Sequence, residues 1–293
     1  MDTKINKIPV DLHCHSTYSD GAHSVKEVLD FVKANNGKHI ALTDHDTVNG
    51  LAEARIYAKE LELKLIGGVE ISVTWDKNVL IHILGLGVDE NNQNLVTNLQ
   101  KLRSFRYLRG EKIAAQLEKA GIPNALEGAL KYCQEKEALS RTHFARFLVE
   151  NGYAKANRVF EKYLAIGRTG YVPQVWAELS DAVSWIKNSG GVAVIAHPAR
   201  YKLTRTKLLR LISDFKTCGG EGIEVISSSH SESECMDIAR IAQECNLLAS
   251  MGTDFHNINN YPKVNVGLNY PLPAICNPIY PRLGIELPCQ ITI

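Results

Sequence analysis

The sequence predicts an α/β fold in which about seven strands form a single barrel. In both flanks of the chain, short apolar runs alternate with amphipathic helical patterns. This alternation indicates βα units and a largely parallel sheet. The middle of the chain has helical patterns only, so we expect a helical segment inserted into the barrel. The length of 293 residues suits one large α/β barrel or two ordinary domains.

The first flank, residues 1–90, opens with a strand predicted over Ile8–Leu12. A helix over Ser24–Asn35 follows, because a serine at the N-cap precedes apolar residues at helical spacing. The rest of this flank is predicted as strand His39–Thr43, helix Gly50–Leu61 and strands Leu65–Ile71 and Leu80–Val88.

The second flank, residues 175–275, resumes the alternation and completes the barrel. Its predicted elements are helices Ser180–Ser189, Leu203–Phe215 and Glu232–Glu244 and strands Gly191–Ala196, Gly222–Ile226 and Leu247–Met251. Residues 91–174 are predicted to be the inserted substrate-binding subdomain, with helices over Asn94–Lys119, Leu126–Glu135 and His143–Asn151. The chain after Pro262 is rich in Pro and Asn and is expected to wrap the surface, with residues 276–293 as a tail.

The amino-acid composition favours a globular protein without a general attraction to nucleic acid or membrane. Hydrophobic residues make up 45% and charged residues 22%, typical of a globular protein in water, and the net charge of +1 gives no global attraction to nucleic acid or membrane. The N-terminus has no long apolar run, and no stretch reaches the roughly 20 apolar residues that span a bilayer. Seven cysteines, an odd number without a CxxC pair, favour a reducing cytoplasm over a disulfide framework.

A pair of histidines closes the first strand. His13 and His15 stand two residues apart, so on a strand both rings project to the same side and can reach one metal ion. Cys14, between them, would point the other way, into the core. An isolated pair of this kind also occurs as ordinary core histidines, and the interpretation depends on where the other ligand-type residues fall.

Further ligand-type residues recur at or near the predicted strands. Barrel enzymes build their sites at the C-terminal ends of the strands, so these residues are expected to converge there. They are Asp44, His45 and Asp46 after the second strand, Glu70 and His82 in the third and fourth, His197 after the fifth, Glu224 in the sixth, and Asp254 and His256 after the seventh. His23, His39 and His230 have no such placement and are interpreted as ordinary polar residues.

Five motifs in this order carry a family resemblance: DLHCHSTYSDG, LTDHD, GVEIS, AHPARY and GTDFH. The sequence resembles the polymerase-and-histidinol-phosphatase (PHP) superfamily from about Val10 to about Leu272. Within it, the segments LEKAGIPNALEGA, SRTHFARFLVENG, KYLAIGRTGYVP and IHILGL resemble the branch of RNase AM and the 3′,5′-nucleoside bisphosphate phosphatases. The resemblance implies a distorted, TIM-like barrel of seven strands with the insertion described above.

The resemblance also implies up to three divalent metal ions, manganese first, with iron or zinc as alternatives. A mixed set of imidazoles and carboxylates suits these metals better than magnesium or calcium. Carried over by motif, one ion would be bound by His13, His15, Glu70 and Asp254, and Glu70 would bridge to a second ion. The second ion would take His82 and His197, and the third would take Asp20, His45 and His256.

Such a metal cluster suits phosphoryl hydrolysis, because the ions bind phosphate oxygens and acidify a bridging water. Glu70, Asp254 and Asp44 are the predicted catalytic residues. Asp44, with Asp46 and Glu224, is expected beside the metal ligands or in proton transfer. Asp44 has an alternative interpretation as the N-cap of the following helix.

The insertion carries a second cluster, which is basic. Arg103, Arg106 and Arg109 recur every three residues, which by itself is typical of a solvated helix face. The branch resemblance instead implies that Arg106 and Arg109 bind phosphate. Ser140-Arg141-Thr142-His143 opens a helix whose N-terminus suits a phosphate, so Arg141 and His143 are added to the predicted substrate-binding residues, together with Arg200.

These expectations combine into a cytoplasmic hydrolase that binds a 5′ phosphate and cleaves at the neighbouring 3′ phosphate. Its predicted substrates are 3′,5′-bisphosphonucleotides and 5′-phosphorylated RNA or oligonucleotides, with the exoribonuclease favoured as the cellular role. No membrane and no obligate protein partner are expected. The alternatives are a histidinol-phosphate-type phosphomonoesterase and an inactive regulatory PHP module.

Overall fold

The computed structural model describes residues 7–76, 79–174, 176–259 and 264–287. Within these ranges a single sheet holds nine strands. They are β1 (Val10–Cys14), β2 (His39–Leu42), β3 (Lys64–Trp75), β4 (Val79–Leu86), β5 (Ala177–Glu178), β6 (Val192–Ile195), β7 (Gly222–Ile226), β8 (Leu248–Met251) and β9 (Asn277–Pro278).

The strand order is β1-β2-β3-β4-β6-β7-β8-β9, and β5 pairs with β3. All neighbours are parallel except β4, which runs antiparallel to both β3 and β6. The sheet curls so that the chain after β8 approaches β1, where the Asp254 N–H donates to the His13 carbonyl at 2.8 Å. The α/β class is confirmed. The predicted barrel of seven strands is not, because the described strands form a curled half-barrel with the two-residue strands β5 and β9 added.

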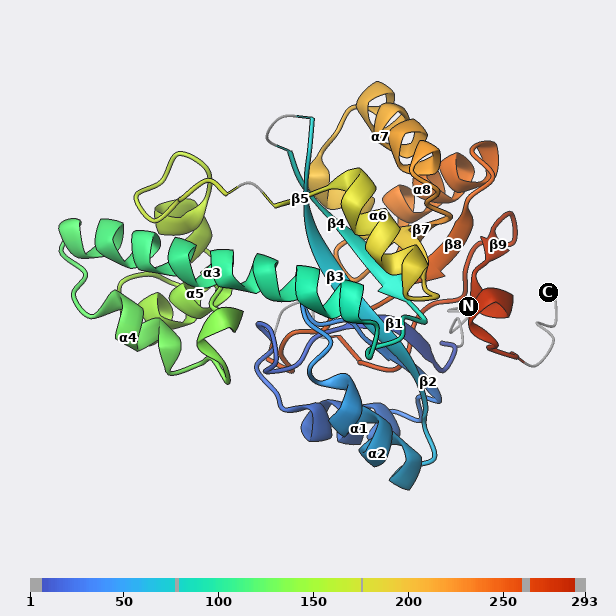
Figure 1. Cartoon of the computed structure of the whole chain (residues 1–293), viewed down its shortest axis with the longest axis horizontal. Coiled ribbons are helices and arrows are strands. Elements are labelled where there is room, and N and C mark those ends of the chain that lie inside the picture. Colours follow the sequence, from blue (N-terminus) through green and yellow to red (C-terminus); the bar gives the residue numbers. More distant parts are fainter. Residues whose placement is uncertain (1–6, 77–78, 175, 260–263, 288–293) are drawn as a thin grey trace, which may run out of the picture.

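The helices that cover the sheet lie close to their predicted positions (Figure 1). Two of them begin with a capping box, in which a serine and a glutamate three residues later satisfy each other's backbone N–H groups: Ser24 with Glu27, and Ser231 with Glu234. The helices are α1 (Val25–Ala34), α2 (Leu51–Glu60), α6 (Leu179–Asn188), α7 (Arg205–Thr217) and α8 (Glu232–Glu244).

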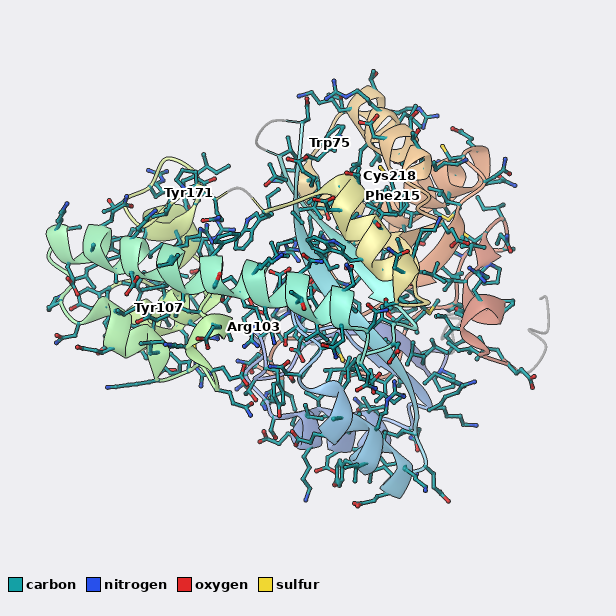
Figure 2. All side chains as sticks on the ribbon, viewed as in Figure 1. Trp75, Arg103, Tyr107, Tyr171, Phe215 and Cys218 are labelled. Carbon is teal, nitrogen blue, oxygen red and sulfur yellow. The ribbon has the colours of Figure 1, made fainter. Side chains whose placement is uncertain are left out.

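A second hydrophobic core lies apart from the sheet. Its buried residues all fall between Ile113 and Val172, and this part of the chain is here called the helical lobe. Tyr107 and Tyr171 lie at this lobe, whereas Phe215 is buried in the main core beside the sheet (Figure 2). The helices of this part are α3 (Gln93–Lys119), α4 (Ala125–Leu130), η1 (Lys136–Ala138), α5 (Arg141–Glu150) and the π-helical turn η2 (Phe160–Leu164).

Helix α3 belongs to both cores. Leu95, Leu99 and Leu102 pack in the main core, and Ile113 and Leu117 pack in the lobe. The lobe is therefore joined to the sheet by a continuous helix of 27 residues. A continuous helix is stiffer than a loop, because bending it breaks backbone hydrogen bonds.

The C-terminal segment was predicted to wrap the surface, and the described part of it is more deeply integrated. Ile279, Tyr280 and Ile285 are buried in the main core, and β9 pairs with β8. The isolated apolar residues among Pro and Asn gave no periodic signal, which is why the sequence did not predict this. No helix among the described residues is long and apolar enough to cross a membrane, and the six described cysteines are unpaired.

We predict that Phe144→Ala lowers the free energy of unfolding by about 3–5 kcal/mol, because the side chain is fully buried in the core of the lobe. Phe160→Ala is the matched control. Phe160 belongs to the same lobe but is 41% exposed, so its loss should cost less than about 1 kcal/mol. Urea denaturation followed by circular dichroism measures both, and equal losses would contradict a separate lobe core.

Candidate metal centre

The two histidines of β1 meet the prediction for their geometry. The Nε2 atoms of His13 and His15 lie 3.1 Å apart on one side of the strand. Cys14 lies on the opposite side, fully buried, with its thiol donating to the Ala41 carbonyl at 3.3 Å. The alternation of a strand is thus what aims both imidazoles at the same point.

Two carboxylates complete a first group around this point. Glu70 Oε2 lies 3.3 Å from both Nε2 atoms, and Asp254 Oδ1 lies 3.4 Å from His13 and 3.3 Å from His15. All four ligand atoms fall within 4.8 Å of one another. Four lone-pair donors that converge in a buried place suit a divalent cation with mixed nitrogen and oxygen ligands.

Glu70 faces more than one group of imidazoles. Its Oε1 lies 2.9 Å from His82 Nδ1 and 2.9 Å from His197 Nε2, and its Oε2 lies 3.0 Å from His45 Nδ1. Glu70 was predicted near the end of its strand, but β3 continues five residues further to Trp75. His82 lies in the first half of β4. Because β4 runs antiparallel to β3, this position places His82 beside Ser72 of β3.

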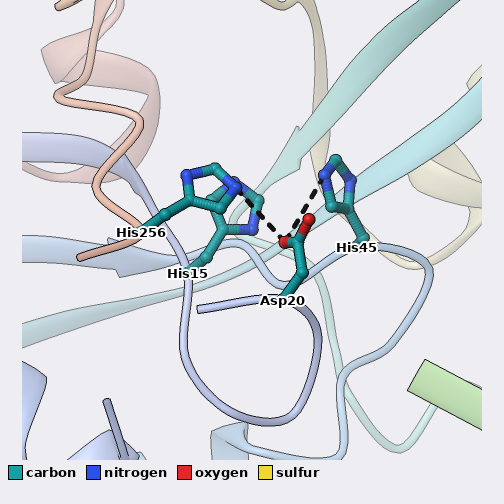
Figure 3. A group of neighbouring side chains, drawn as sticks. All are labelled: His15, Asp20, His45 and His256. Carbon is teal, nitrogen blue, oxygen red and sulfur yellow. Dashed lines mark ion pairs between the residues drawn. The ribbon is translucent and has the colours of Figure 1, made fainter. Parts of the chain in front are cut away.

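A third group gathers around Asp20 (Figure 3). Its Oδ1 lies 3.2 Å from His256 Nε2 and 3.8 Å from His45 Nε2, and His15 completes the set. The other oxygen, Oδ2, accepts a hydrogen bond from Thr142 Oγ1 at 2.9 Å. One carboxylate therefore connects the metal-type ligands to the start of α5 in the helical lobe.

The electrostatics of the cluster favour a cation. Burial alone would raise the pKa of Glu70 and Asp254, but the surrounding imidazoles hold both pKa values well below the usual range, so both carboxylates are ionised. Burial lowers the pKa of His197 to about 4, which leaves a neutral imidazole able to bind a metal. For His15, Asp254 and Glu70 outweigh burial and raise the pKa to about 10. The ionised carboxylates of Glu70 and Asp254 therefore favour a positive charge next to the imidazole nitrogens, either a proton or a metal ion.

Unpaired polar atoms support the same conclusion. Within the described part of the chain, several buried ligand atoms of the cluster have no hydrogen-bond partner: Asp20 Oδ1, His45 Nδ1 and Glu70 Oε2. Leaving such atoms buried and unsatisfied costs free energy, and a bound metal ion removes that cost. The residues present therefore fit a metal centre.

A shell of acidic residues holds the ligands in place. Glu224 accepts from the backbone N–H of His197 at 2.6 Å and lies 3.1 Å from His13 Nδ1, so it orients the His13 imidazole and the backbone that carries His197. Asp11, which the sequence analysis passed over, accepts from the N–H and the hydroxyl of Thr253 at 2.8 and 2.6 Å. Asp11 stands two residues before His13 on the same strand, and this spacing could have indicated a role beside the metal-type ligands. A Cβ at Gly252 would overlap the Cβ of His13, so only glycine fits there.

Asp44 does not cap α2, since that helix begins at Leu51 after Gly50. Both of its oxygens instead accept hydrogen bonds from the loop that follows β1: Ser16 N–H at 2.8 Å, Ser16 Oγ at 2.7 Å and Ser19 Oγ at 2.6 Å. Ser19 Oγ lies in turn 3.4 Å from His15 Nδ1. Asp44 therefore orders the loop that carries Asp20.

The predicted phosphate-binding residues fall into different situations. The guanidinium of Arg106 is nearly buried and donates from Nε to Asp46 and from Nη2 to Ser72. Arg109 and Arg141 have no carboxylate partner within 4.0 Å among the described residues, and they donate only to the backbone carbonyls of Val172 and Leu164. Phosphate binding by Arg106, Arg109 and Arg141 therefore stays a prediction, and among the described residues Arg109 and Arg141 form no ion pair.

His143 and Arg200 have different surroundings. His143 Nδ1 accepts from the Ser140 N–H at 3.1 Å, so the neutral ring carries its proton on Nε2, which has no partner. Arg200 Nη1 donates to Asp254 Oδ2 at 2.6 Å, and its side chain is 47% exposed. The predicted substrate-binding residues therefore include a neutral, buried imidazole on α5 and a half-exposed guanidinium beside Asp254.

Known proteins share this arrangement. Residues 11–172, more than half of the chain, match the PHP domain. A 3′,5′-nucleoside bisphosphate phosphatase of Chromobacterium violaceum is 46% identical over 279 residues, which cover 95% of this chain and 97% of that protein. The 5′-3′ exoribonuclease Rnm of Escherichia coli is 42% identical over 267 residues, 90% of each chain.

Solved structures agree. A protein of Chromobacterium violaceum described as an amidohydrolase with bound sulfate superposes with a TM-score of 0.90, at 45% identity over 94% of this chain and 96% of that one. A Bifidobacterium adolescentis protein assigned as a metal-dependent phosphoesterase has a TM-score of 0.79 at 25% identity, over 88% and 91%. The fold and the site define a metal-dependent hydrolase. By its sequence matches, the chain belongs to the PHP family.

We predict that Glu70→Ala removes bound metal as well as turnover, because Glu70 faces every group of imidazoles in the site. Elemental analysis of manganese-loaded protein measures the metal, and phosphate release measures turnover. Glu118→Ala, an exposed glutamate on α3, is the control and should change neither. Full metal occupancy with a near-normal rate in Glu70→Ala would contradict its bridging role.

Asp20→Ala should lower the bound metal by one equivalent, because this carboxylate supplies the only acidic ligand of the third group. Asp20→Asn is the matched variant. It keeps an acceptor for Thr142 but loses the charge, so it should also lose metal while α5 stays in place. Titration with manganese followed by elemental analysis measures the bound metal. A wild-type metal count in both variants would show that Asp20 is only a turn residue.

Proposed function

We propose that this chain is a metal-dependent phosphoesterase that acts on 5′-phosphorylated nucleotides and RNA. It would release phosphate from 3′,5′-bisphosphonucleotides, and it would release 5′-mononucleotides stepwise from the 5′ end of RNA. One observation carries the proposal: Arg141 lies close enough to the metal-type ligand Asp20 for that carboxylate to act on its pKa, and Arg109 lies close to Arg141. Neither arginine forms an ion pair among the described residues. The relatives named above, a nucleoside bisphosphate phosphatase and an exoribonuclease, support the same substrates.

The metal centre is proposed to hold up to three ions, manganese first, with iron or zinc as alternatives. His13, His15, Glu70 and Asp254 would hold one ion. His82 and His197 would hold a second with Glu70, and Asp20, His45 and His256 would hold a third. When bound, these ions would neutralise phosphate charge and acidify the attacking water.

The 5′ phosphate is proposed to bind between α3 and α5. Burial and the positive charges of Arg141 and Arg106 lower the pKa of Arg109 to about 9, so an anion placed there would relieve both burial and repulsion. Guanidinium groups bind phosphate oxygens in pairs, and a terminal phosphate carries more charge than an internal phosphodiester. His143 would add a neutral donor through Nε2–H.

The same chemistry serves both substrates. The oxygen of a water molecule bonds to phosphorus, the P–O3′ bond breaks, and a proton ends on the released O3′. Asp254 and Glu70 would orient the water with their ionised carboxylates, and Arg200 would contact the reacting phosphate from the solvent side of Asp254. Asp44 would act indirectly, by holding Ser19 against His15.

The two alternatives fit less well. A histidinol-phosphate-type monoesterase needs no site for a second phosphate, and it would leave the buried charges of Arg109 and Arg141 unexplained. An inactive regulatory module would be expected to lose at least one ligand, whereas all three groups of ligands are intact. Incubating manganese-loaded protein with 5′-phosphorylated and 5′-hydroxyl oligonucleotides and with a 3′,5′-bisphosphonucleotide tests the proposal by product identity.

Arg141→Ala should lower kcat/KM for 5′-phosphorylated substrates by roughly tenfold to a hundredfold, since a charge-assisted contact is worth about 1.5–3 kcal/mol. A 5′-hydroxyl oligonucleotide lacks the group that Arg141 binds, so its slow cleavage should hardly change. Arg146→Ala, on the same helix but paired at the surface with Glu150, is the control. Equal losses on both substrates would show that Arg141 serves the fold rather than the 5′ phosphate.

A further inference from the structure

A buried ion pair joins α3 to the sheet directly beside the metal-type ligands. Arg106 donates from Nε to Asp46 Oδ2 at 2.7 Å and from Nη2 to Ser72 Oγ at 2.8 Å. Asp46 is fully buried and Arg106 is 7% exposed. Among the described residues, the hydrogen bonds of this guanidinium are thus made to the segments that flank Glu70.

Asp46 is fixed to the strand of Glu70 on two sides. Its N–H donates to the Glu70 carbonyl at 2.9 Å, and its Oδ1 accepts from the Ser72 N–H at 2.7 Å. Its φ of 53° is unusual for a residue other than glycine, and the surrounding hydrogen bonds hold it there. A shift of Asp46 must therefore move the backbone of Glu70.

The other side of Arg106 contacts the proposed phosphate site. Its guanidinium carbon lies 4.9 Å from the centre of the Trp176 ring, and that of Arg109 lies 5.8 Å from the same ring. Trp176 is itself tied to β3, because its N–H donates to Thr74 Oγ1 at 2.8 Å. Arg109, Trp176, Arg106 and Asp46 form a continuous line of contacts that ends at Glu70.

We infer that Arg106 is a positioning residue, which couples occupation of the 5′-phosphate site to the placement of Glu70. The inference rests on the proposed function and goes beyond it, because it assigns to Arg106 and Asp46 the task of converting 5′-phosphate binding into a faster chemical step. A buried ion pair adds little stability compared with an apolar pair of the same volume. The pair of Arg106 and Asp46 is therefore better explained by the precise position that it gives to Glu70. The fork geometry matters, since lysine cannot contact Asp46 and Ser72 at once in the same way.

The test is Arg106→Lys, assayed with 5′-phosphorylated and 5′-hydroxyl oligonucleotides. For the 5′-phosphorylated substrate, KM should stay within about threefold of the wild-type value while kcat falls by about tenfold or more, because binding is kept and its use in the reaction is lost. The 5′-hydroxyl substrate should change less than about threefold. Arg103→Lys is the matched control, another buried arginine of α3, paired with Glu135 and without contact to Trp176.

Three results would overturn the inference. A raised KM with unchanged kcat would make Arg106 a phosphate ligand, and an equal loss of kcat on both substrates would make it merely structural. If Arg103→Lys reproduced the effect, any disturbance of α3 would suffice. A wild-type protein with no preference for the 5′ phosphate would instead refute the proposed function itself, which separates the two failures.

A second readout does not depend on turnover. A 2′,3′-dideoxynucleoside 5′-monophosphate has the 5′ phosphate but no 3′ oxygen to reach the metals. It should raise the manganese affinity of the wild-type protein about fivefold or more, as coupling between sites requires, and leave that of Asp46→Asn unchanged. Asp46→Asn keeps the acceptor for Ser72, so it also serves if Arg106→Lys fails to fold. Equal enhancement in both proteins would overturn the coupling.

Discussion

The buried carboxylate of Glu70 is the interaction on which the rest of the site depends. An ionised group without solvent needs compensating charge around it, and here each oxygen of Glu70 faces different imidazoles, although Oε2 accepts no hydrogen bond among the described residues. This requirement explains the long β3, which carries Glu70 in mid-strand, and the reversed β4, which brings His82 beside it. It also accounts for the way in which separate segments of the chain converge on Glu70.

The supporting residues convert this convergence into fixed geometry. Three carboxylates are buried here, those of Asp11, Asp44 and Glu224. Each accepts hydrogen bonds that hold a metal-type ligand or its loop in place. His197 and Asp254 have positive φ values of 25° and 51°, which ordinary residues avoid. Strain of this kind persists only where the surroundings enforce it. Part of the stability gained from burying the sheet is therefore used to keep the ligands in unfavourable backbone conformations.

The convergence of the ligand-type residues could be predicted from the sequence, whereas the seven-stranded barrel could not, and the reason is physical. His13 and His15 could be paired because strand alternation is strict, and Asp254 could be added because parallel strands end at one edge. The direction of β4 carries no local signal, and β5 and β9 are too short to have a period. Arginines three residues apart show which helix face they share but not their partners, so the pairing of Arg106 with Asp46 could not be foreseen. The site followed from local rules, whereas the contacts between lobe and sheet are long-range.

In the proposed function, those long-range contacts would let a protein of nearly zero net charge select a phosphorylated end. The metal-type ligand Asp20 uses one oxygen for Thr142 of the helical lobe, and Asp46, next to His45, uses one oxygen for Arg106 of α3. The lobe is therefore attached to the site by buried or nearly buried carboxylates rather than by loops alone, and α3 adds a continuous helix. Rigid attachment fixes the separation between the charges of the lobe and the metal-type ligands. In the proposed function, that separation has to match one nucleotide, so selection for substrate length resides in the packing of the lobe and not in an extended basic surface, which a net charge of +1 does not provide.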